Sequence, residues 1–243
     1  MNVLIACEES QEVTAAFIAL GHNAMSCDLQ PGAKGLPHYQ GDMFDLDFSK
    51  FDLVIAHPPC TYIANSGNRW HAGTQRRQDA ADFIWRVWNI PVAHLALENP
   101  IGQINKYLPE MPKPQYIQPW QFGHGETKAT GLWLRGLPTL KPTNIVEGRE
   151  QRIWKMPPSP DRQRERSRTF PGIAQAMAQQ WGSLAFQHSM HQTRGSLRDL
   201  EGFYKPEVLS TSQALSTPPR AGNANRWADP LPARKKVKIG FKK

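Results

Sequence analysis

Two side chains with complementary chemistry stand at the ends of two strongly apolar stretches. Cys60 closes the stretch Phe-Asp-Leu-Val-Ile-Ala-His-Pro-Pro-Cys, and Glu98 follows the apolar run 92–97. A thiol acts as a nucleophile once a neighbouring charge or a helix end lowers its pKa. A carboxyl group behind a buried strand and before a proline loses solvation, which raises its pKa and suits a proton donor. Together they predict a nucleophile and an acid acting on one ring.

Cys60, Glu98 and two further candidate residues, Asp28 and Asp42, each also have a purely structural interpretation. A free cysteine is usually a small buried hydrophobic residue. Glu98 could simply cap the turn that follows it. Asp28 could bind the ribose hydroxyls of a nucleoside-containing cofactor or remain a surface carboxylate. Asp42 could accept a hydrogen bond from an adenine amine or occupy an ordinary turn.

Runs of apolar residues predict the elements that position these groups. The run Leu53 to Ala56 is typical of a parallel strand buried on both faces, and two prolines then end it. Further strands are expected over 2–7, 23–27, 92–97 and 130–134, with short ones before Gly41 and near Tyr116, and helices over 10–20, 75–88 and 172–184. Ser10 is expected to cap the first helix. This alternation predicts an α/β protein with a doubly wound, mostly parallel sheet.

The carboxyl ends of neighbouring parallel strands lie at one edge of a sheet, and ligands bind at that edge in open α/β proteins. The residues Cys7-Glu8-Glu9-Ser10, Asp28, Cys60 and Glu98 all follow predicted strands. We therefore expect them to meet at a single edge. The segment 101–168 is interrupted by many prolines and gives a weaker pattern.

Charge is distributed unevenly along the 243 residues. Residues 187–243 contain eleven Lys and Arg against four Asp and Glu, a net charge of +7, whereas residues 1–186 contain eighteen against seventeen, a net charge of +1. Residues 187–243 lack apolar periodicity, so we expect a disordered basic tail behind a catalytic domain over 1–186. Such a tail favours a polyanion such as nucleic acid as partner, although some basic tails are only solubilising.

The three cysteines (Cys7, Cys27 and Cys60) have no metal-ligand spacing, and their odd number argues against a disulfide framework. The apolar start of the chain is too short for a signal peptide, and no run reaches the length of a membrane span. We expect a cytoplasmic monomer that binds neither a metal ion nor a membrane.

His57-Pro58-Pro59-Cys60, followed by Glu98-Asn99-Pro100, resembles the Pro-Cys and Glu-Asn motifs of the DNA cytosine carbon-5 methyltransferases. In that family the cysteine adds to carbon 6 of a flipped cytosine, the glutamate protonates ring nitrogen 3, and carbon 5 takes the methyl group of S-adenosylmethionine. The resemblance implies a Rossmann-like S-adenosylmethionine-dependent methyltransferase fold, with Cys60 as nucleophile and Glu98 as acid.

Residues 1–185 are more closely similar to a compact group of bacteriophage-encoded DNA methyltransferase-like proteins. The likeness is carried by residues 6–10, 55–70, 118–123, 128–130 and 166–170. It implies a protein that works in the cytoplasm of an infected bacterium and shields phage DNA from restriction.

The resemblance also implies two sets of binding residues. Those expected near the cofactor are Cys7, Glu8, Glu9, Ser10, Asp28, Asp42, His57 and Pro58. Those expected near DNA or the flipped base are Pro59, Asn99, Arg69, Arg76, Arg77 and Lys128.

This chain also departs from the family's pattern. Its first loop lacks the Phe-x-Gly-x-Gly pattern of the larger enzymes, and no Gln-x-Arg-x-Arg element is evident. Lys128 or Arg69 would therefore have to supply the positive charge beside the thiol. The segment 101–168 is the only candidate for a target-recognition region, which is thus reduced.

Basic and aromatic residues form two clusters, a composition that suits phosphate contacts and base stacking. The first contains Arg69, Trp70, His71, Arg76 and Arg77, and the second contains Arg149, Arg152, Arg162, Arg164, Arg166 and Arg168. The second cluster is equally well explained as a solvated basic face.

Three other functions fit parts of this pattern. One is methylation of an exocyclic amine of adenine or cytosine, in which an aromatic residue stands at the position of Cys60. Another is a catalytically inactive DNA-binding protein with the same fold, and the third is an enzyme that acts on a free nucleotide. The presence of both Cys60 and Glu98 favours carbon-5 methylation, and the basic tail argues against a free nucleotide.

Overall fold

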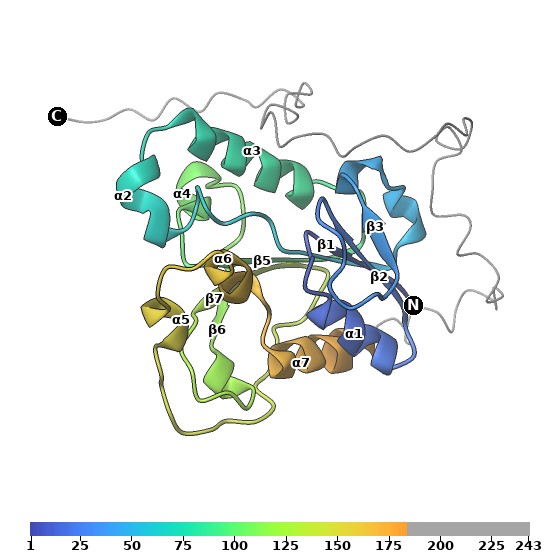
Figure 1. The fold of residues 1–243 in the computed structure, drawn as a ribbon. Coiled ribbons are helices and arrows are strands. Elements are labelled where there is room, and N and C mark those ends of the chain that lie inside the picture. Colours follow the sequence, from blue (N-terminus) through green and yellow to red (C-terminus); the bar gives the residue numbers. More distant parts are fainter. Residues whose placement is uncertain (184–243) are drawn as a thin grey trace, which may run out of the picture. The chain divides into compact units, whose positions relative to one another are not determined.

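A computed structural model describes residues 1–183, which form a seven-stranded sheet with helices on both faces (Figure 1). The strands are β1 (Asn2–Ala6), β2 (Asn23–Asp28), β3 (His38–Gln40), β4 (Leu53–Ala56), β5 (His94–Pro100), β6 (Gln115–Ile117) and β7 (Thr130–Arg135). The helices are α1 (Glu12–Ala19), α2 (Asn68–His71), α3 (Gln75–Trp88), α4 (Ile104–Tyr107), α5 (Arg152–Lys155), α6 (Arg162–Ser167) and α7 (Pro171–Gly182). The predicted tail over 187–243 lies outside the described residues.

The strand order is β3-β2-β1-β4-β5-β7-β6. Strands β1 to β5 all run parallel to one another, and β7 runs antiparallel between β5 and β6. This order with a single reversed strand fits the Rossmann-like methyltransferase fold that the resemblance implies. The predicted doubly wound, mostly parallel sheet is confirmed. The strands expected near Tyr116 and over 130–134 are β6 and β7, so part of the segment 101–168 belongs to this sheet.

The central strands are apolar, and both faces of the sheet are buried. In β4, Leu53 to Ala56 are fully buried, as the continuous apolar run predicts. Helices α1 and α7 pack together on one face through residues such as Phe17 and Trp181, whereas α3 covers the opposite face (Figure 1). Because β1, β2, β4 and β5 are parallel, their carboxyl ends lie at one edge of the sheet, and the candidate site forms there.

Candidate functional site

The loop that carries the thiol is tied to the strand that carries the acid. Asn99 is fully buried, and its Nδ2 donates a hydrogen bond of 2.8 Å to the Pro58 carbonyl. Beyond Pro59, the Cys60 carbonyl accepts hydrogen bonds from the backbone of Ile63 and Ala64. Cys60 thus stands on a braced turn at the same edge of the sheet as Glu98. Asn99 Oδ1 is buried without a partner within residues 1–183, so the expected contact of Asn99 with the base stays a prediction.

Glu98 does not stand alone, because His57 reaches it from the end of β4. The distance from His57 Nδ1 to Glu98 Oε2 is 3.2 Å, and the two side chains are only 11% and 15% exposed. The Nε2 atom of His57 is buried without a hydrogen-bond partner in the described part of the chain. The structure therefore directs His57, predicted to lie near the cofactor, toward the acid.

This pair reverses the expected ionisation of Glu98. Burial raises the pKa of Glu98, but the hydrogen bond and charge of His57 and the charge of Lys128 together bring it below 4.5. Burial lowers the pKa of His57, yet Glu98 and the nearby Glu8 outweigh this and raise it above 6.5. The prediction of a raised pKa for Glu98 is wrong. It considered desolvation only, and the histidine that outweighs desolvation lies 41 residues earlier in the chain.

Lys128 supplies positive charge beside the thiol, as one of the two candidates for that role. Its Nζ donates to the Arg168 carbonyl at 2.9 Å, and burial lowers its pKa although Glu98 and Cys60 oppose this. Burial and Glu98 raise the pKa of the Cys60 thiol, whereas Lys128 and Arg166 act in the opposite direction. The thiol is therefore protonated at rest. We call Cys60, His57, Glu98 and Lys128 the thiol cluster.

A second group of side chains, Glu8, Glu9, Asp28 and Asp42, lies across the same edge, and we call it the acidic cluster. Burial raises the pKa of the neighbouring Cys7 thiol, and the charges of Asp28 and Asp42 raise it further. Asp28 Oδ1 accepts a hydrogen bond from the Gln30 backbone, and Asp42 Oδ1 accepts one from the Phe44 backbone. Each of the two aspartates uses one carboxylate oxygen in these backbone contacts.

Glu8 serves helix α1 instead of a ligand. Its carboxylate accepts hydrogen bonds from the Val13 and Thr14 backbone and from the Thr14 hydroxyl, and the residue is 4% exposed. These contacts satisfy the free amides at the helix start, so Glu8 replaces Ser10 as the cap. The prediction of Ser10 as the cap is wrong, and the expected cofactor contact of Glu8 does not apply in this structure.

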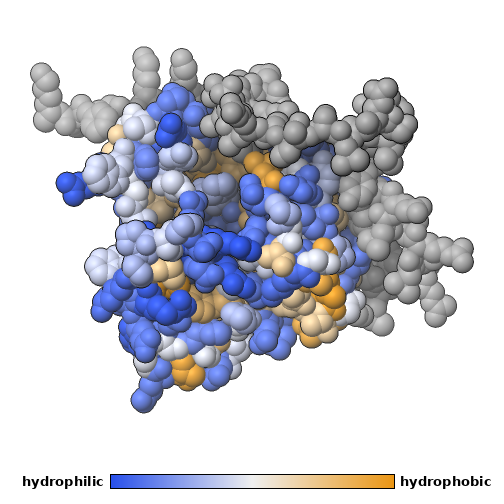
Figure 2. Space-filling model, in the orientation of Figure 1, coloured by the Kyte–Doolittle hydropathy of each residue, from blue (hydrophilic) through white to orange (hydrophobic). Residues whose placement is uncertain are grey.

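The acidic cluster is also crossed by helix α6. Arg164 pairs with Glu9 at 2.9 Å, and Arg168 pairs with Glu12 at 2.7 Å. These contacts place α6 beside the first loop, and hydrophilic residues dominate the face on which it lies (Figure 2). Arg166 differs from Arg164 and Arg168, since it makes no hydrogen bond or ion pair within residues 1–183. Its charge acts on the Cys60 thiol. No local sequence signal distinguishes it.

The first basic cluster divides into exposed and internal residues. Arg69 and Arg76 are exposed, as is Trp70 at 71%, and the Arg69 guanidinium lies 5.2 Å from the Trp70 ring centroid. Arg77 is 1% exposed and donates hydrogen bonds to the Tyr62 carbonyl and to Asn68 Oδ1. The predicted DNA contact of Arg77 is therefore wrong for this conformation, in which Arg77 braces the loop from inside.

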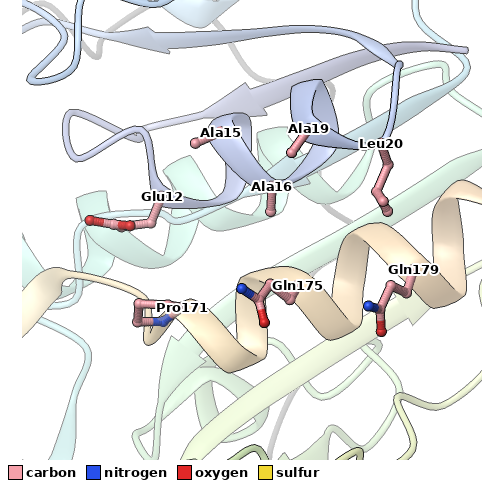
Figure 3. Close-up of a pocket in the computed structure, with 8 residues that line it drawn as sticks. All are labelled: Glu12, Ala15, Ala16, Ala19, Leu20, Pro171, Gln175 and Gln179. Atoms are coloured by element: carbon pink, nitrogen blue, oxygen red, sulfur yellow. The ribbon is translucent and has the colours of Figure 1, made fainter.

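A groove of about 480 Å³ lies elsewhere, between α1 and α7 (Figure 3). Alanine, leucine, proline and glutamine side chains line it, with Glu12 at one end. It contains no predicted site residue and no nucleophile, so it is a packing groove between two helices.

Within residues 1–183 no helix is long and apolar enough to cross a membrane, and no group of side chains there could hold a metal ion.

Neither a protein-family model nor a curated protein matches the chain. Solved structures similar to it include a prophage-encoded E. coli protein described as a DNA modification methyltransferase (14% identity, TM-score 0.43), the S. pombe Dnmt2 methyltransferase (16%, 0.38) and the Entamoeba histolytica methyltransferase EhMeth (13%, 0.40). The matches cover 60%, 64% and 62% of this chain, and 52%, 54% and 57% of the other chains, respectively. This chain thus spans little more than half of their length.

Proposed function

We propose that this protein transfers a methyl group from S-adenosylmethionine to carbon 5 of cytosine in DNA. The observation that carries the proposal is the hydrogen bond from Asn99 to the Pro58 carbonyl, which ties the Cys60 loop to the strand of Glu98. A soft nucleophile, an acid and a cation then act at one place. This combination is what addition to a conjugated ring requires.

In this mechanism Cys60 Sγ, after its proton has passed to water, forms a bond to carbon 6 of the cytosine. The ring electrons move toward nitrogen 3, which takes a proton from Glu98. Carbon 5 then accepts the methyl group, loses its own proton to a base and regains the double bond to carbon 6 as Cys60 leaves. The positive charge of Lys128 stabilises both the thiolate and the electron-rich ring.

The residues at the other half of the edge fit S-adenosylmethionine, which when bound would supply an electrophilic methyl group. Asp28 and Asp42 follow β2 and β3 and each keep one carboxylate oxygen outside the backbone contacts described above. Carboxylates at these places suit ribose hydroxyls and an adenine amine. They also suit a positively charged ligand without phosphate groups. Cys7, Glu9, Ser10 and Pro58 belong to the loops that would border this ligand.

DNA would approach over the exposed loop after Cys60. Arg69 and Arg76 would contact phosphates and Trp70 would stack on an exposed base, since each side chain is solvent-accessible. The target base must leave the DNA double helix to reach the half-buried Cys60 thiol. Following the resemblance to bacteriophage proteins, the product would protect phage DNA from restriction in the bacterial cytoplasm.

The proposal is tested by incubating the protein with double-stranded DNA and S-adenosylmethionine, and identifying the methylated nucleoside by mass spectrometry. We expect 5-methylcytosine from the natural chain and from Cys27→Ala, which removes a buried thiol whose pKa burial raises to about 12. We expect none from Cys60→Ala. N6-methyladenine or N4-methylcytosine would instead identify an exocyclic-amine enzyme, and DNA binding without any product would identify an inactive relative.

A further inference from the structure

His57 is the polar residue of the thiol cluster for which the mechanism above has no use. It is largely buried, it lies 3.2 Å from Glu98, and its second ring nitrogen, Nε2, has no hydrogen-bond partner among residues 1–183. A buried histidine needs a reason to be there, because burying a polar ring without satisfying both nitrogens costs free energy.

We propose that His57 is a positioning residue that stores the proton which Glu98 delivers to nitrogen 3 of the target cytosine. The inference rests on the proposed function. At rest the proton is on His57 Nδ1, facing the Glu98 carboxylate. As the base binds, the bond from Nδ1 to hydrogen breaks and a bond from Oε2 to hydrogen forms. Glu98 then passes this proton to the ring, which leaves a neutral imidazole, and the proton returns by the same path when the product departs.

Burial lowers the free-energy cost of moving the proton from His57 to Glu98. The imidazolium–carboxylate pair and the imidazole–carboxylic acid pair have the same net charge of zero. In water the charged pair is strongly favoured, but desolvation penalises two charges and brings the two forms closer in free energy. A base that closes the site removes more water and shifts the proton further toward Glu98. The two groups therefore titrate as one unit, and the acid of this site is the pair.

The charged surroundings keep one proton in the pair at neutral pH. The groups that act on His57 are Glu98 from β5, Glu8 from the loop after β1, and Lys128 from the segment before β7. Burial and Lys128 oppose the proton and the two carboxylates favour it, and the balance raises the pKa of His57. Activity should therefore be lost as pH rises through this raised pKa. Without His57, Glu98 alone must hold the proton and should lose it at lower pH.

The first test is the pH profile of methyl transfer for the natural chain and for His57→Asn, which keeps a polar side chain but cannot carry the proton. We expect the alkaline limb of the His57→Asn profile to move at least one unit toward acid, so that the rate falls more than tenfold at pH 8 and largely recovers near pH 6. The control is His94→Asn at the other end of β5, where Nδ1 contacts the Gly136 carbonyl. Its profile should not move.

The second test needs neither cofactor nor DNA. NMR titration of the His57 ring should give a midpoint above 6.5 in the natural chain and below 6.5 in Glu98→Gln, because burial and Lys128 then lower the pKa of His57 and only Glu8 still raises it. A natural-chain midpoint at or below 6.5 overturns the inference, and so does a His57→Asn profile that is lower at every pH but unmoved. Absence of methyl transfer by the natural chain would overturn the proposed function and with it the delivery step, even if the NMR midpoint shows a shared proton.

Discussion

The thiol cluster and the acidic cluster lie on one sheet edge but use their polar groups differently. In the thiol cluster, His57 Nε2 and the nearby Asn99 Oδ1 are buried with no partner within residues 1–183. In the acidic cluster, both carboxylate oxygens of Glu8 accept internal hydrogen bonds and Glu9 is paired with Arg164. Unsatisfied buried groups cost stability and are tolerated where a ligand uses them. The comparison supports the proposed chemistry at the first cluster, whereas Glu8 and Glu9 of the second cluster mainly hold helices α1 and α6 in place.

The largest effect should follow loss of the acid. Glu98→Gln keeps the size of the side chain but cannot take a proton from His57, so we expect the methyl-transfer rate to fall about 10²- to 10⁴-fold. DNA affinity, measured by fluorescence anisotropy, should change little. A rate within a fewfold of the natural chain would contradict the role of the thiol cluster.

A large loss of stability is expected at Arg77. Arg77→Ala removes two buried hydrogen bonds from a charged donor, and we expect the free energy of unfolding to fall by about 3 kcal/mol. The matched variant is Arg76→Ala, which removes an exposed arginine one position earlier. It should weaken DNA binding with a stability change below about 0.5 kcal/mol. Equal stability of the two variants in urea denaturation would refute the division of this basic cluster.

A smaller loss of stability should follow Glu8→Ala. The variant leaves the start of α1 without its carboxylate cap, and we expect a cost of about 2 kcal/mol. The neighbouring Glu9→Ala breaks a partly exposed ion pair and should cost less than about 1 kcal/mol. If chemical denaturation ranks these two variants in the opposite order, the acidic cluster is not organised as described.

The smallest effect concerns the pH dependence of stability. The lowered pKa of Glu98 contributes stability above pH 4.5, which is lost as pH falls through the folded value. The raised pKa of His57 contributes stability below pH 6.5, which is lost as pH rises through the folded value. Both contributions are complete between these limits. The double variant His57→Asn, Glu98→Gln should therefore lose more stability, relative to the natural chain, at pH 5.5 than at pH 9, as urea denaturation at the two pH values would measure.

Local patterns were enough to predict much of the framework. The helix predicted over 75–88 is observed as Gln75–Trp88, because its apolar spacing matches the helical period. The apolar run before His57 formed the buried strand it predicts, and the strand order brought Cys60 and Glu98 to one edge. These successes depend on short-range periodicity and on the geometry common to parallel sheets.

The errors arise where a distant partner decides the outcome. Glu98 has a lowered pKa because His57 reaches it from another strand, and Arg77 is internal because the Tyr62 carbonyl accepts a hydrogen bond from its Nε. Glu8 displaced Ser10 as the cap because the chain turns at Cys7 through a left-handed backbone conformation with φ of 58°. None of these contacts is visible in the residues next to each position.

The most direct test of the central claim is covalent trapping. The protein is mixed with S-adenosylmethionine and DNA that contains 5-fluorocytosine, whose fluorine cannot leave as a cation, and the products are separated under denaturing conditions. We predict a stable protein–DNA adduct with the natural chain and none with Cys60→Ala. Methyl transfer to ordinary cytosine without any adduct, or an adduct that persists in Cys60→Ala, would contradict the account.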